Sequence, residues 1–471
     1  MTGPGLASLL MEHPFADDEG LLYTIDRTVN AGDARRAASA MASELRAQGV
    51  EPGAAVAVAL PNGPEYITTM TGVWLAGAVF VPMNPRFPPA EIERVLTATD
   101  PSAIVDVDGT TSRDASRRYD DGVAFVMWTS GTTGAPKAIL HTHDAYLELL
   151  DRVLGPLRGQ SAQNPAKPPT PNLIPVSLAL NAGIYNTLFG LRAGASLVIM
   201  DRFDTKEFAE LVRRFEIRST VLPPGAMAML SDDDAVTDLT PLRYVRSITA
   251  PLSPLQARRF TDKFGAVVLN SYGQAEIGEV IGWTAADARE HPEKVGAIGR
   301  PHPGVDLRVV SDDGNDVTPG DVGVLVVRPP NMAAGYASGE ELRDRVDADG
   351  FVNTGDLARV DEDGFVWVEG RAGDLINRGG NKVFPEQVEE VLCLAPGISE
   401  AAVVGVPDER LGEVPVAFVV GDAPDEELVA LCREHLVPYK VPVAFVHVDS
   451  LPRTEVGKVI RRELSEQYQP T

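Results

Sequence analysis

The sequence predicts an α/β fold with a large N-terminal domain of helix-covered sheets, a small β-barrel-like subdomain and a small α+β C-terminal domain. The length of 471 residues exceeds what one hydrophobic core usually serves, so two or more domains are expected. Residues 34–107 alternate between helical patterns and short apolar runs. Such alternation is typical of a largely parallel sheet covered by helices.

The elements of the first half follow in a regular order. Residues 34–50 predict an amphipathic helix that Gly49 ends, and residues 54–60 predict a buried strand. The pattern then repeats as a helix feeding a strand over 66–82, a helix over 89–100 and a strand over 102–107. A second alternating set covers 195–273. Between the two sets, the polar and proline-rich residues 155–172 predict an exposed loop.

The pattern changes twice in the second half of the chain. Residues 304–310, 323–330 and 364–371 are short strand patterns with Asp/Gly turns between them, which indicates a β-rich subdomain over about 299–371. After Arg371 the helical and strand patterns form a compact α+β set. The sequence therefore predicts an N-terminal domain over 1–371, a hinge at 372–373 and a C-terminal domain over 374–471.

The composition narrows the class of protein. The formal net charge of −25 disfavours a nucleic-acid partner, because such a chain repels a phosphate backbone overall. Cys393 and Cys432 are the only cysteines, which fits a reducing compartment, and we expect a cytoplasmic enzyme. We expect no signal peptide and no membrane span, because the most apolar window, 66–82, is short and carries three threonines.

A stretch rich in hydroxyl groups, "TSGTTGAPK" (129–137), follows a buried strand pattern. Backbone N–H groups and the hydroxyls of Thr129, Ser130 and Thr132 suit phosphate oxygens. A P-loop of the usual kind needs glycine before its lysine, Ser or Thr after it, and then a helix. Here Pro136 precedes Lys137, Ala138 follows it, and a strand pattern comes next. The stretch predicts a phosphate-binding loop of another kind, with a hairpin tip as the alternative.

Five motifs occur in one order along the chain: "TSGTTGAPK", "NSYGQAEIGE", "NTGDL", "GRAGDLINRGGNKVFPEQVE" and "PRTEVGKVIRREL". Together they resemble the signatures of the adenylate-forming superfamily, which includes acyl- and aryl-CoA ligases, peptide-synthetase adenylation domains and beetle luciferases. The resemblance covers nearly the whole chain and is greatest to an acid–CoA ligase. It implies that ATP and a carboxylate give acyl-AMP and pyrophosphate, after which a thiol attacks the acyl-AMP.

The resemblance also implies roles for individual residues. Lys458 would reach between the carboxylate and the α-phosphate, and Glu276 would bind Mg²⁺. Read alone, Lys458 also fits a solvated surface lysine and Asp356 a turn aspartate. The implied contacts to the β- and γ-phosphates are Thr129, Ser130, Gly131, Thr132, Thr133, Gly134 and Lys137. The implied contacts to adenine and ribose are Thr249, Ala250, Pro251, Tyr272, Gly273, Asp356, Val368 and Arg371.

The implied hinge at Gly373 lets the mobile C-terminal domain serve two steps. Lys458 would complete the adenylation site in one orientation, and Gly379 and Gly380 would make room for the pantetheine arm of coenzyme A in the other. The implied cofactors are ATP, Mg²⁺ and coenzyme A. The implied partners are small molecules, with a carrier protein as an alternative acceptor, and the assembly is a monomer or a homodimer.

The chain departs from the family pattern near the acyl group. Ala275 stands where the family usually has threonine, Leu178 stands at a position often held by histidine, and "SITAPL" (247–252) replaces a glycine-rich version. No Phe-Asp pair stands in the region where the amino-acid-activating members of the family hold the substrate ammonium, so an aliphatic or aromatic acid is expected. The expected lining of the acyl pocket, with ordinary core packing as the alternative, is Leu178, Leu180, Asn181, Ile184 and Ile248.

Three other functions remain open from the sequence. The first is a stand-alone ligase that passes its acyl group from acyl-AMP to a carrier protein or another acceptor. The second is a luciferase-like oxygenase, which oxygen uptake or light would reveal. The third is a sensor that holds ATP without turnover.

Overall fold

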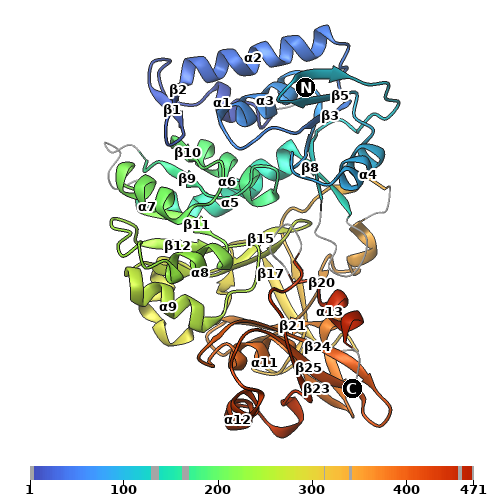
Figure 1. Ribbon diagram of the computed structural model, residues 1–471. Helices are drawn as coiled ribbons and strands as arrows, with labels where there is room; N and C mark the ends of the chain where they lie inside the picture. Colours follow the sequence, from blue (N-terminus) through green and yellow to red (C-terminus); the bar gives the residue numbers. More distant parts are fainter. Residues whose placement is uncertain are drawn as a thin grey trace.

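The computed structural model describes residues 5–128, 137–161, 169–311, 313–338, 342–453 and 459–468, with the backbone alone for 156–161 and 343–344. Six sheets are arranged from the N-terminal layers at one end of the molecule to the C-terminal layers at the other (Figure 1). The expected α/β class is confirmed.

A seven-stranded mixed sheet organises the first part of the chain, in the order β19-β8-β7-β4-β3-β5-β6. Val56 and Val58 belong to one hydrophobic core, whereas Ala55 and Ala57 belong to another, so both faces of the sheet are covered. The strands are β3 (Ala55–Val58), β4 (Val79–Pro82), β5 (Ala103–Asp106), β6 (Gly109–Ser112), β7 (Val123–Trp128), β8 (Ala138–Thr142) and β19 (Gly335–Tyr336). The helices of this part are α1 (Ser8–Met11), α2 (Ala31–Ala47), α3 (Pro64–Leu75) and α4 (Pro89–Thr99).

Two smaller sheets form the second part. One has the order β2-β1-β10-β9 and the other β11-β12-β13, and the latter is parallel throughout. Their strands are β1 (Gly20–Tyr23), β2 (Thr28–Asn30), β9 (Asn172–Ile174), β10 (Leu197–Ile199), β11 (Ser219–Leu222), β12 (Tyr244–Ser247) and β13 (Val267–Leu269). The helices are α5 (His143–Ser161), α6 (Asn181–Arg192), α7 (Thr205–Arg214), α8 (Pro224–Asp232), α9 (Pro254–Phe264) and α10 (Ala285–Glu290).

The expected loop over 155–172 is wrong in its first part, because α5 continues to Ser161. The buried side chains of Tyr146, Leu150 and Val153 hold the preceding turns of this helix in the core. An established helix adds one hydrogen bond for each further residue, so it extends past Gly155 despite the prolines nearby.

The expected β-rich subdomain over about 299–371 contains the antiparallel sheet β17-β18-β20-β21. A second antiparallel sheet, β14-β15-β16, begins before that range and reaches it only at β16. Strands were expected at β17, β18 and β21, and the structure has them. The strands are β14 (Ser271–Gln274), β15 (Gly278–Gly282), β16 (Arg300–Pro301), β17 (Asp306–Val310), β18 (Gly323–Arg328), β20 (Val352–Val360) and β21 (Val366–Arg371). Short 3-10 helices lie at η1 (Pro292–Lys294) and η2 (Leu342–Arg345).

The C-terminal part has its own five-stranded sheet and its own core. Ala417 and Val419 face one hydrophobic cluster, while Val416 and Phe418 face another. The strands are β22 (Ile376–Arg378), β23 (Asn381–Val383), β24 (Ile398–Asp408), β25 (Gly412–Gly421) and β26 (Ala444–His447). The helices are α11 (Pro385–Leu392), α12 (Asp425–His435) and α13 (Arg461–Gln467), with 3-10 helices η3 (Ala372–Asp374) and η4 (Pro438–Lys440). The proposed division at 372–373 falls in η3, between the two sheets.

A partly buried ionic cluster connects α13 to α11 and to the proposed hinge. The guanidinium of Arg461 bonds both carboxylate oxygens of Glu389, and its Nη2 lies 3.2 Å from Oε1 of Glu386. Its Nε lies 3.7 Å from Asp374, the last residue of η3. Burial raises the pKa of Glu386 to about 7, against the opposing charge of Arg461. Arg461 is the cation that compensates these carboxylates.

We therefore expect Arg461→Ala to lower the free energy of unfolding by about 2–4 kcal/mol, because it leaves partly buried carboxylates without their cation. Urea unfolding measures the change. Arg462→Ala is the matched control: its side chain is 81% exposed and pairs only with Glu466 among the described residues, so we expect little effect. Equal stability of the two variants would contradict the structural role of Arg461.

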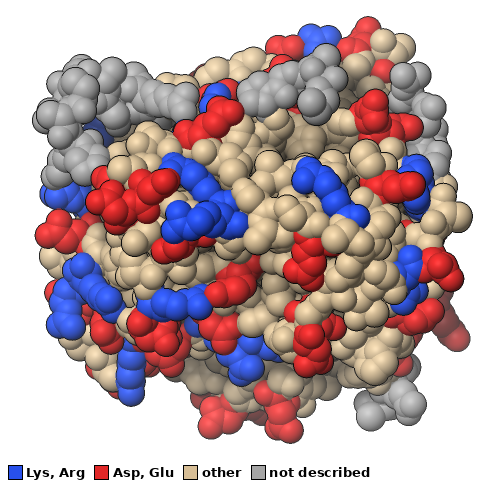
Figure 2. Space-filling view, turned by 90° about the horizontal axis from the view of Figure 1, so that it is seen from above, with Lys and Arg blue, Asp and Glu red and all other residues tan. Residues whose placement is uncertain are grey.

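The surface seen from above carries both signs of charge. Figure 2 shows Lys and Arg interspersed with Asp and Glu on this face, rather than gathered in one basic patch. Within the described ranges, no helix has both the length and the apolar character needed to cross a membrane.

Candidate active site

A buried carboxylate, that of Asp356, marks the centre of the candidate site. Asp356 lies on β20 opposite Arg371 on β21, and Nε of Arg371 is 3.3 Å from its Oδ1. The hydroxyl of Tyr272 donates to Oδ2, and Nε2 of Gln274 lies 3.2 Å from the same oxygen. The side chain is only 7% exposed. Three expected nucleotide contacts, Asp356, Tyr272 and Arg371, are therefore neighbours in the structure.

Residues Tyr272, Gln274 and Glu276 bring polar side chains from one motif to this site. Burial and the charge of Asp356 raise the pKa of Tyr272 well above its usual value, so its phenol remains a donor. Gly273 lies between them, and a Cβ there would sit 2.2 Å from the carbonyl oxygen of Gly278. Only glycine fits this close pairing of β14 with β15.

The carboxylate of Glu276 occupies a second buried position. Its Oε1 accepts from the hydroxyl of Tyr336 at 3.2 Å and from Nη1 of Arg345 at 3.1 Å. Nζ of Lys137 lies 4.8 Å from the ring centre of Tyr336, so the end of the expected phosphate loop is close to Glu276. Nη2 of Arg345 also reaches Oε1 of Gln274 at 3.2 Å, which connects this carboxylate to the Asp356 cluster.

Glu276 offers one carboxylate to a magnesium ion. Within the described ranges, no group of three or more His, Cys, Asp or Glu side chains forms a metal cage. Magnesium is commonly held by one or two carboxylates together with phosphate oxygens and water. Both polar contacts of Glu276 named above use Oε1. A role for Glu276 as the single protein ligand therefore fits its surroundings and stays a prediction.

Several expected residues lie outside the described part of the chain. Lys458 is one, and six members of the phosphate loop are others: Thr129, Ser130, Gly131, Thr132, Thr133 and Gly134. Their roles stay predictions. The strands that flank the loop, β7 and β8, pair antiparallel, with Trp128 opposite Ala138.

The segment expected to face adenine has an unusual backbone. Thr249 has φ of +73°, one of three described non-glycine residues with positive φ. A β-branched residue is strained in this region, where the family pattern has glycine. Thr249 and Ala250 are half-buried and Pro251 is exposed. Val368 is half-buried on β21 and packs against the core of the β-rich subdomain.

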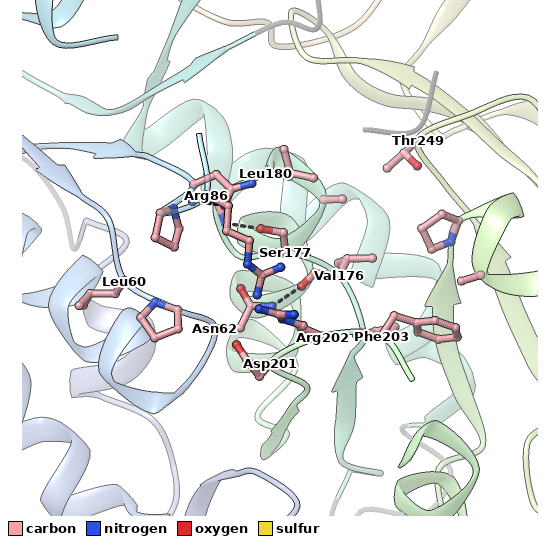
Figure 3. A pocket seen from close by; sticks show the side chains of 18 residues that line it. Leu60, Asn62, Arg86, Val176, Ser177, Leu180, Asp201, Arg202, Phe203 and Thr249 are labelled. Carbon is pink, nitrogen blue, oxygen red and sulfur yellow. Dashed lines mark hydrogen bonds between the residues drawn. The ribbon is translucent and has the colours of Figure 1, made fainter. Parts of the chain in front are cut away.

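A cavity of about 350 Å³ opens beside Thr249. Asn62 fixes one wall, because its Nδ2 donates to the carbonyl oxygen of Val176 at 3.1 Å and to that of Met200 at 3.0 Å. Figure 3 shows the side chains of Arg86 and Arg202 pointing into the same space. Both arginines are exposed. Asp201 lines the same cavity, so these three side chains leave one net positive charge there, although the whole chain carries a formal charge of −25.

Of the residues expected to line the acyl pocket, only some line the two cavities of the described structure. Leu178 and Ile184 are each 1% exposed and belong to the main hydrophobic core, which fits the alternative of ordinary core packing, so their role in the pocket stays a prediction. Leu180 lines the cavity of about 350 Å³, and Asn181 lines a smaller cavity of about 20 Å³ together with Glu276. Ile248 is half-buried and packs against the main core.

The expected hinge and thiol-tunnel residues lie in two separate turns. Gly373 is the middle residue of η3, and a Cβ there would meet no atom within 4 Å. Gly379 and Gly380 form the β22–β23 turn with φ of +58° and +90°, a conformation that favours glycine. In Figure 1, β23 lies far from β8, which leads away from the phosphate loop. The tunnel role stays a prediction.

Three site residues were not expected from the sequence. Gln274 could have been found from the sequence, because it lies two residues after Tyr272 in a strand, and alternate residues of a strand share a face. Arg345 and Tyr336 had no such signal, since each lies about 60 to 70 residues from its partner Glu276.

Comparison with known proteins decides the family. Residues 13–121 and 111–337 match the AMP-binding enzyme family, and residues 387–458 match the AMP-binding enzyme C-terminal domain. The chain belongs to the AMP-binding enzymes. The expected membership of the adenylate-forming superfamily is thus confirmed. Feruloyl-CoA synthase from Amycolatopsis is 31% identical over 463 residues, with 92% of each chain covered. Long-chain-fatty-acid–CoA ligase from Escherichia coli O157:H7 is 28% identical, with 89% of this chain and 86% of the relative covered.

Solved structures match this AMP-binding enzyme over nearly its whole length. ATP-bound MatB from Rhodopseudomonas palustris superimposes with a TM-score of 0.86 at 25% identity, with 98% of both chains covered. Amide bond synthetase McbA from Marinactinospora thermotolerans also gives 0.86 at 27% identity, with 99% of this chain and 100% of McbA covered. The names of these similar proteins differ in both the acid and the acceptor of the acyl group. Similarity alone therefore does not identify the acid or the acceptor of this chain.

Proposed function

We propose that this AMP-binding enzyme is an acid–CoA ligase, which joins a carboxylic acid to ATP and then transfers the acyl group to coenzyme A. The proximity of Asp356, Tyr272, Arg371, Glu276 and Lys137 carries the proposal. An enzyme that adenylates must hold a ribose and a triphosphate at the same time. Buried acceptors suit the ribose, and a cation beside a carboxylate suits the phosphates.

The first half-reaction brings an anionic carboxylate to an anionic triphosphate, and electrostatic repulsion is the main barrier. Asp356 would accept from the ribose hydroxyls, with Arg371 holding the carboxylate in place. Lys137 and the hydroxyl-rich loop would bind the outer phosphates. Magnesium, when bound at Glu276, would neutralise phosphate charge, and Arg345 would hold Glu276 in position. Lys458 would stabilise the α-phosphate as the acid oxygen attacks.

The cationic cavity supports coenzyme A as the acceptor. Coenzyme A carries phosphates at one end and a thiol at the end of a long arm. Arg86 and Arg202 line the cavity at one side and Thr249 at the other. A volume of about 350 Å³ is within the usual range for small-molecule sites. A phosphate-bearing acceptor fits this opening, and rotation of the C-terminal domain at 372–373 would bring Gly379 and Gly380 to it.

An amine acceptor is the second candidate, since one similar structure is an amide bond synthetase. A carrier-protein thiol is the third. An amine offers the two arginines no phosphate, and the phosphopantetheine arm of a carrier protein offers one where coenzyme A offers three, so we prefer coenzyme A.

A panel of carboxylic acids, with pyrophosphate release measured with and without coenzyme A, tests the proposal. We expect acid-dependent pyrophosphate release, and a thioester only when coenzyme A is added. Arg86→Ala and Arg202→Ala, made separately, should each raise the KM for coenzyme A about 10- to 100-fold and leave the KM for ATP unchanged, because a charged hydrogen bond is worth about 1.5–3 kcal/mol. Acyl-AMP that accumulates without thioester formation would exclude coenzyme A as the acceptor.

A further inference from the structure

The first turns of helix α6 lie between the two cavities. Leu180 and Ala182 line the larger cavity, whereas Asn181 lines the smaller one together with Ala275 and Glu276. In the proposed function Glu276 lies at the reacting phosphates, and an acid bound beside it would then extend along this end of α6. The side chains of α6 that follow Asn181 on the same face are therefore in position to contact the far end of the acid.

Several polar side chains lie among the apolar ones around this position. The hydroxyl of Tyr146 lies 3.2 Å from Oδ1 of Asn181. His141 lines the smaller cavity, and its Nε2 is buried without a hydrogen-bond partner in the described structure. Burial lowers the pKa of His141 to about 3, so its ring is neutral. An unpaired ring nitrogen at a cavity wall indicates a missing polar partner.

Tyr185 lies one helical turn after Asn181 and carries the strongest signal. Its hydroxyl is buried and has no hydrogen-bond partner in the described part of the chain. Burial raises the pKa of Tyr185 well above its usual value, so the hydroxyl is protonated and able to donate. A buried hydroxyl without a partner costs about 1–3 kcal/mol, and native proteins keep few of them without a reason.

Charged groups from three other elements surround this hydroxyl. Glu279 on β15 pairs with Arg246 on β12 at 2.7 Å and with His302 at 2.8 Å. Arg152 on α5 donates to the carbonyl oxygen of Glu279 at 3.3 Å, and its Nε is buried without a partner among the described residues. The carboxylate of Glu279 is thus paired, while Tyr185 and Arg152 retain donors.

We propose that the acid substrate carries an oxygen at the end remote from its reacting carboxylate, and that the Tyr185 hydroxyl donates a hydrogen bond to this oxygen. This inference rests on the function proposed above. Arg152 is the second donor at this position. A phenolic hydroxyl, a carbonyl or a second carboxylate each supplies such an oxygen, whereas a plain alkyl chain would leave both donors unpaired. The polar cluster also changes the expectation of an entirely apolar acyl pocket.

Matched pairs of acids test the proposal: 4-hydroxycinnamate against cinnamate, and adipate against hexanoate. Pyrophosphate release gives kcat/KM for each acid. We expect the wild-type enzyme to prefer the oxygen-bearing member of at least one pair by 10-fold or more. Tyr185→Phe should reduce that preference about 10-fold by lowering kcat/KM only for that member, because the hydrogen bond to its remote oxygen is lost.

The control variant is Tyr23→Phe, whose hydroxyl bonds the carbonyl oxygen of Gly20 in another sheet and should not alter the preference. Urea unfolding checks that Tyr185→Phe is folded, and Tyr185→Leu repeats the test with a side chain of another shape. Equal use of both members of both pairs by the wild-type enzyme would overturn the inference. So would an equal loss for both members in Tyr185→Phe. Turnover of cinnamate or hexanoate alone would reject the inference and leave the ligase function intact, whereas no turnover of any acid would reject both.

Discussion

Lys458→Ala is expected to stop acyl-AMP formation while largely sparing thioester formation from supplied acyl-AMP. An ammonium about 4 Å from a developing negative charge contributes roughly 4 kcal/mol at an effective dielectric constant near 20. Its loss should slow adenylation about several hundred-fold or more. The second half-reaction has no triphosphate to neutralise. In the proposed rotated state, the C-terminal domain faces the site with the turn at Gly379 and Gly380 instead of Lys458. Two separate assays measure the change: acid-dependent exchange of pyrophosphate into ATP, and thioester formation from synthetic acyl-AMP.

Lys206→Ala is the control, because Lys206 is exposed on α7 in the N-terminal part, and both assays should be unchanged. Equal loss of both half-reactions in Lys458→Ala would contradict the idea that the C-terminal domain uses different residues in the two steps. An unchanged exchange rate would remove Lys458 from the adenylation site altogether.

Asp356→Asn is expected to weaken ATP binding strongly. The amide keeps the size of the side chain but loses the charge that Arg371 pairs with and one acceptor that the ribose would use. Because hydrogen bonds to charged groups are worth about 1.5–3 kcal/mol, the KM for ATP should rise about 10- to 100-fold. The variant should also lose stability, since the buried Tyr272 hydroxyl now faces an amide. ATP titration of pyrophosphate release measures the first effect, and urea unfolding measures the second.

Asp349→Asn provides the comparison, because Asp349 is exposed in the hairpin before β20 and should tolerate the change. If Asp356→Asn lost stability but kept the wild-type KM for ATP, then Asp356 would be a structural residue alone. That outcome would support the alternative from the sequence, in which Asp356 is an ordinary turn aspartate.

The sequence predicts the fold well where periodicity and order carry the information. The alternation of helices and strands before residue 107 reappears as a sheet with two cores, because alternate residues of β3 are apolar toward both faces. Motif order places Tyr272, Asp356 and Arg371 together, although 84 positions separate the first two. A paired register between β20 and β21 brings Arg371 opposite Asp356, which no local pattern specifies.

The side-chain network of the site is less predictable. Arg345 and Tyr336 reach Glu276 from distant segments, and neither segment has a periodic pattern of its own. Leu178 and Ile184 looked like pocket residues because they are apolar and close to the motifs, but apolar residues are also what a core requires. The unpaired hydroxyl of Tyr185 depends on the packing of three elements, so it is visible only in three dimensions.

A crystal structure of the enzyme with ATP bound tests the central claim most directly. We predict the ribose hydroxyls within hydrogen-bond distance of Asp356, the adenine beside Tyr272, and the outer phosphates against Lys137 and residues 129–136. A nucleotide bound elsewhere, without contact to Asp356 or Lys137, would contradict this account of the adenylation site.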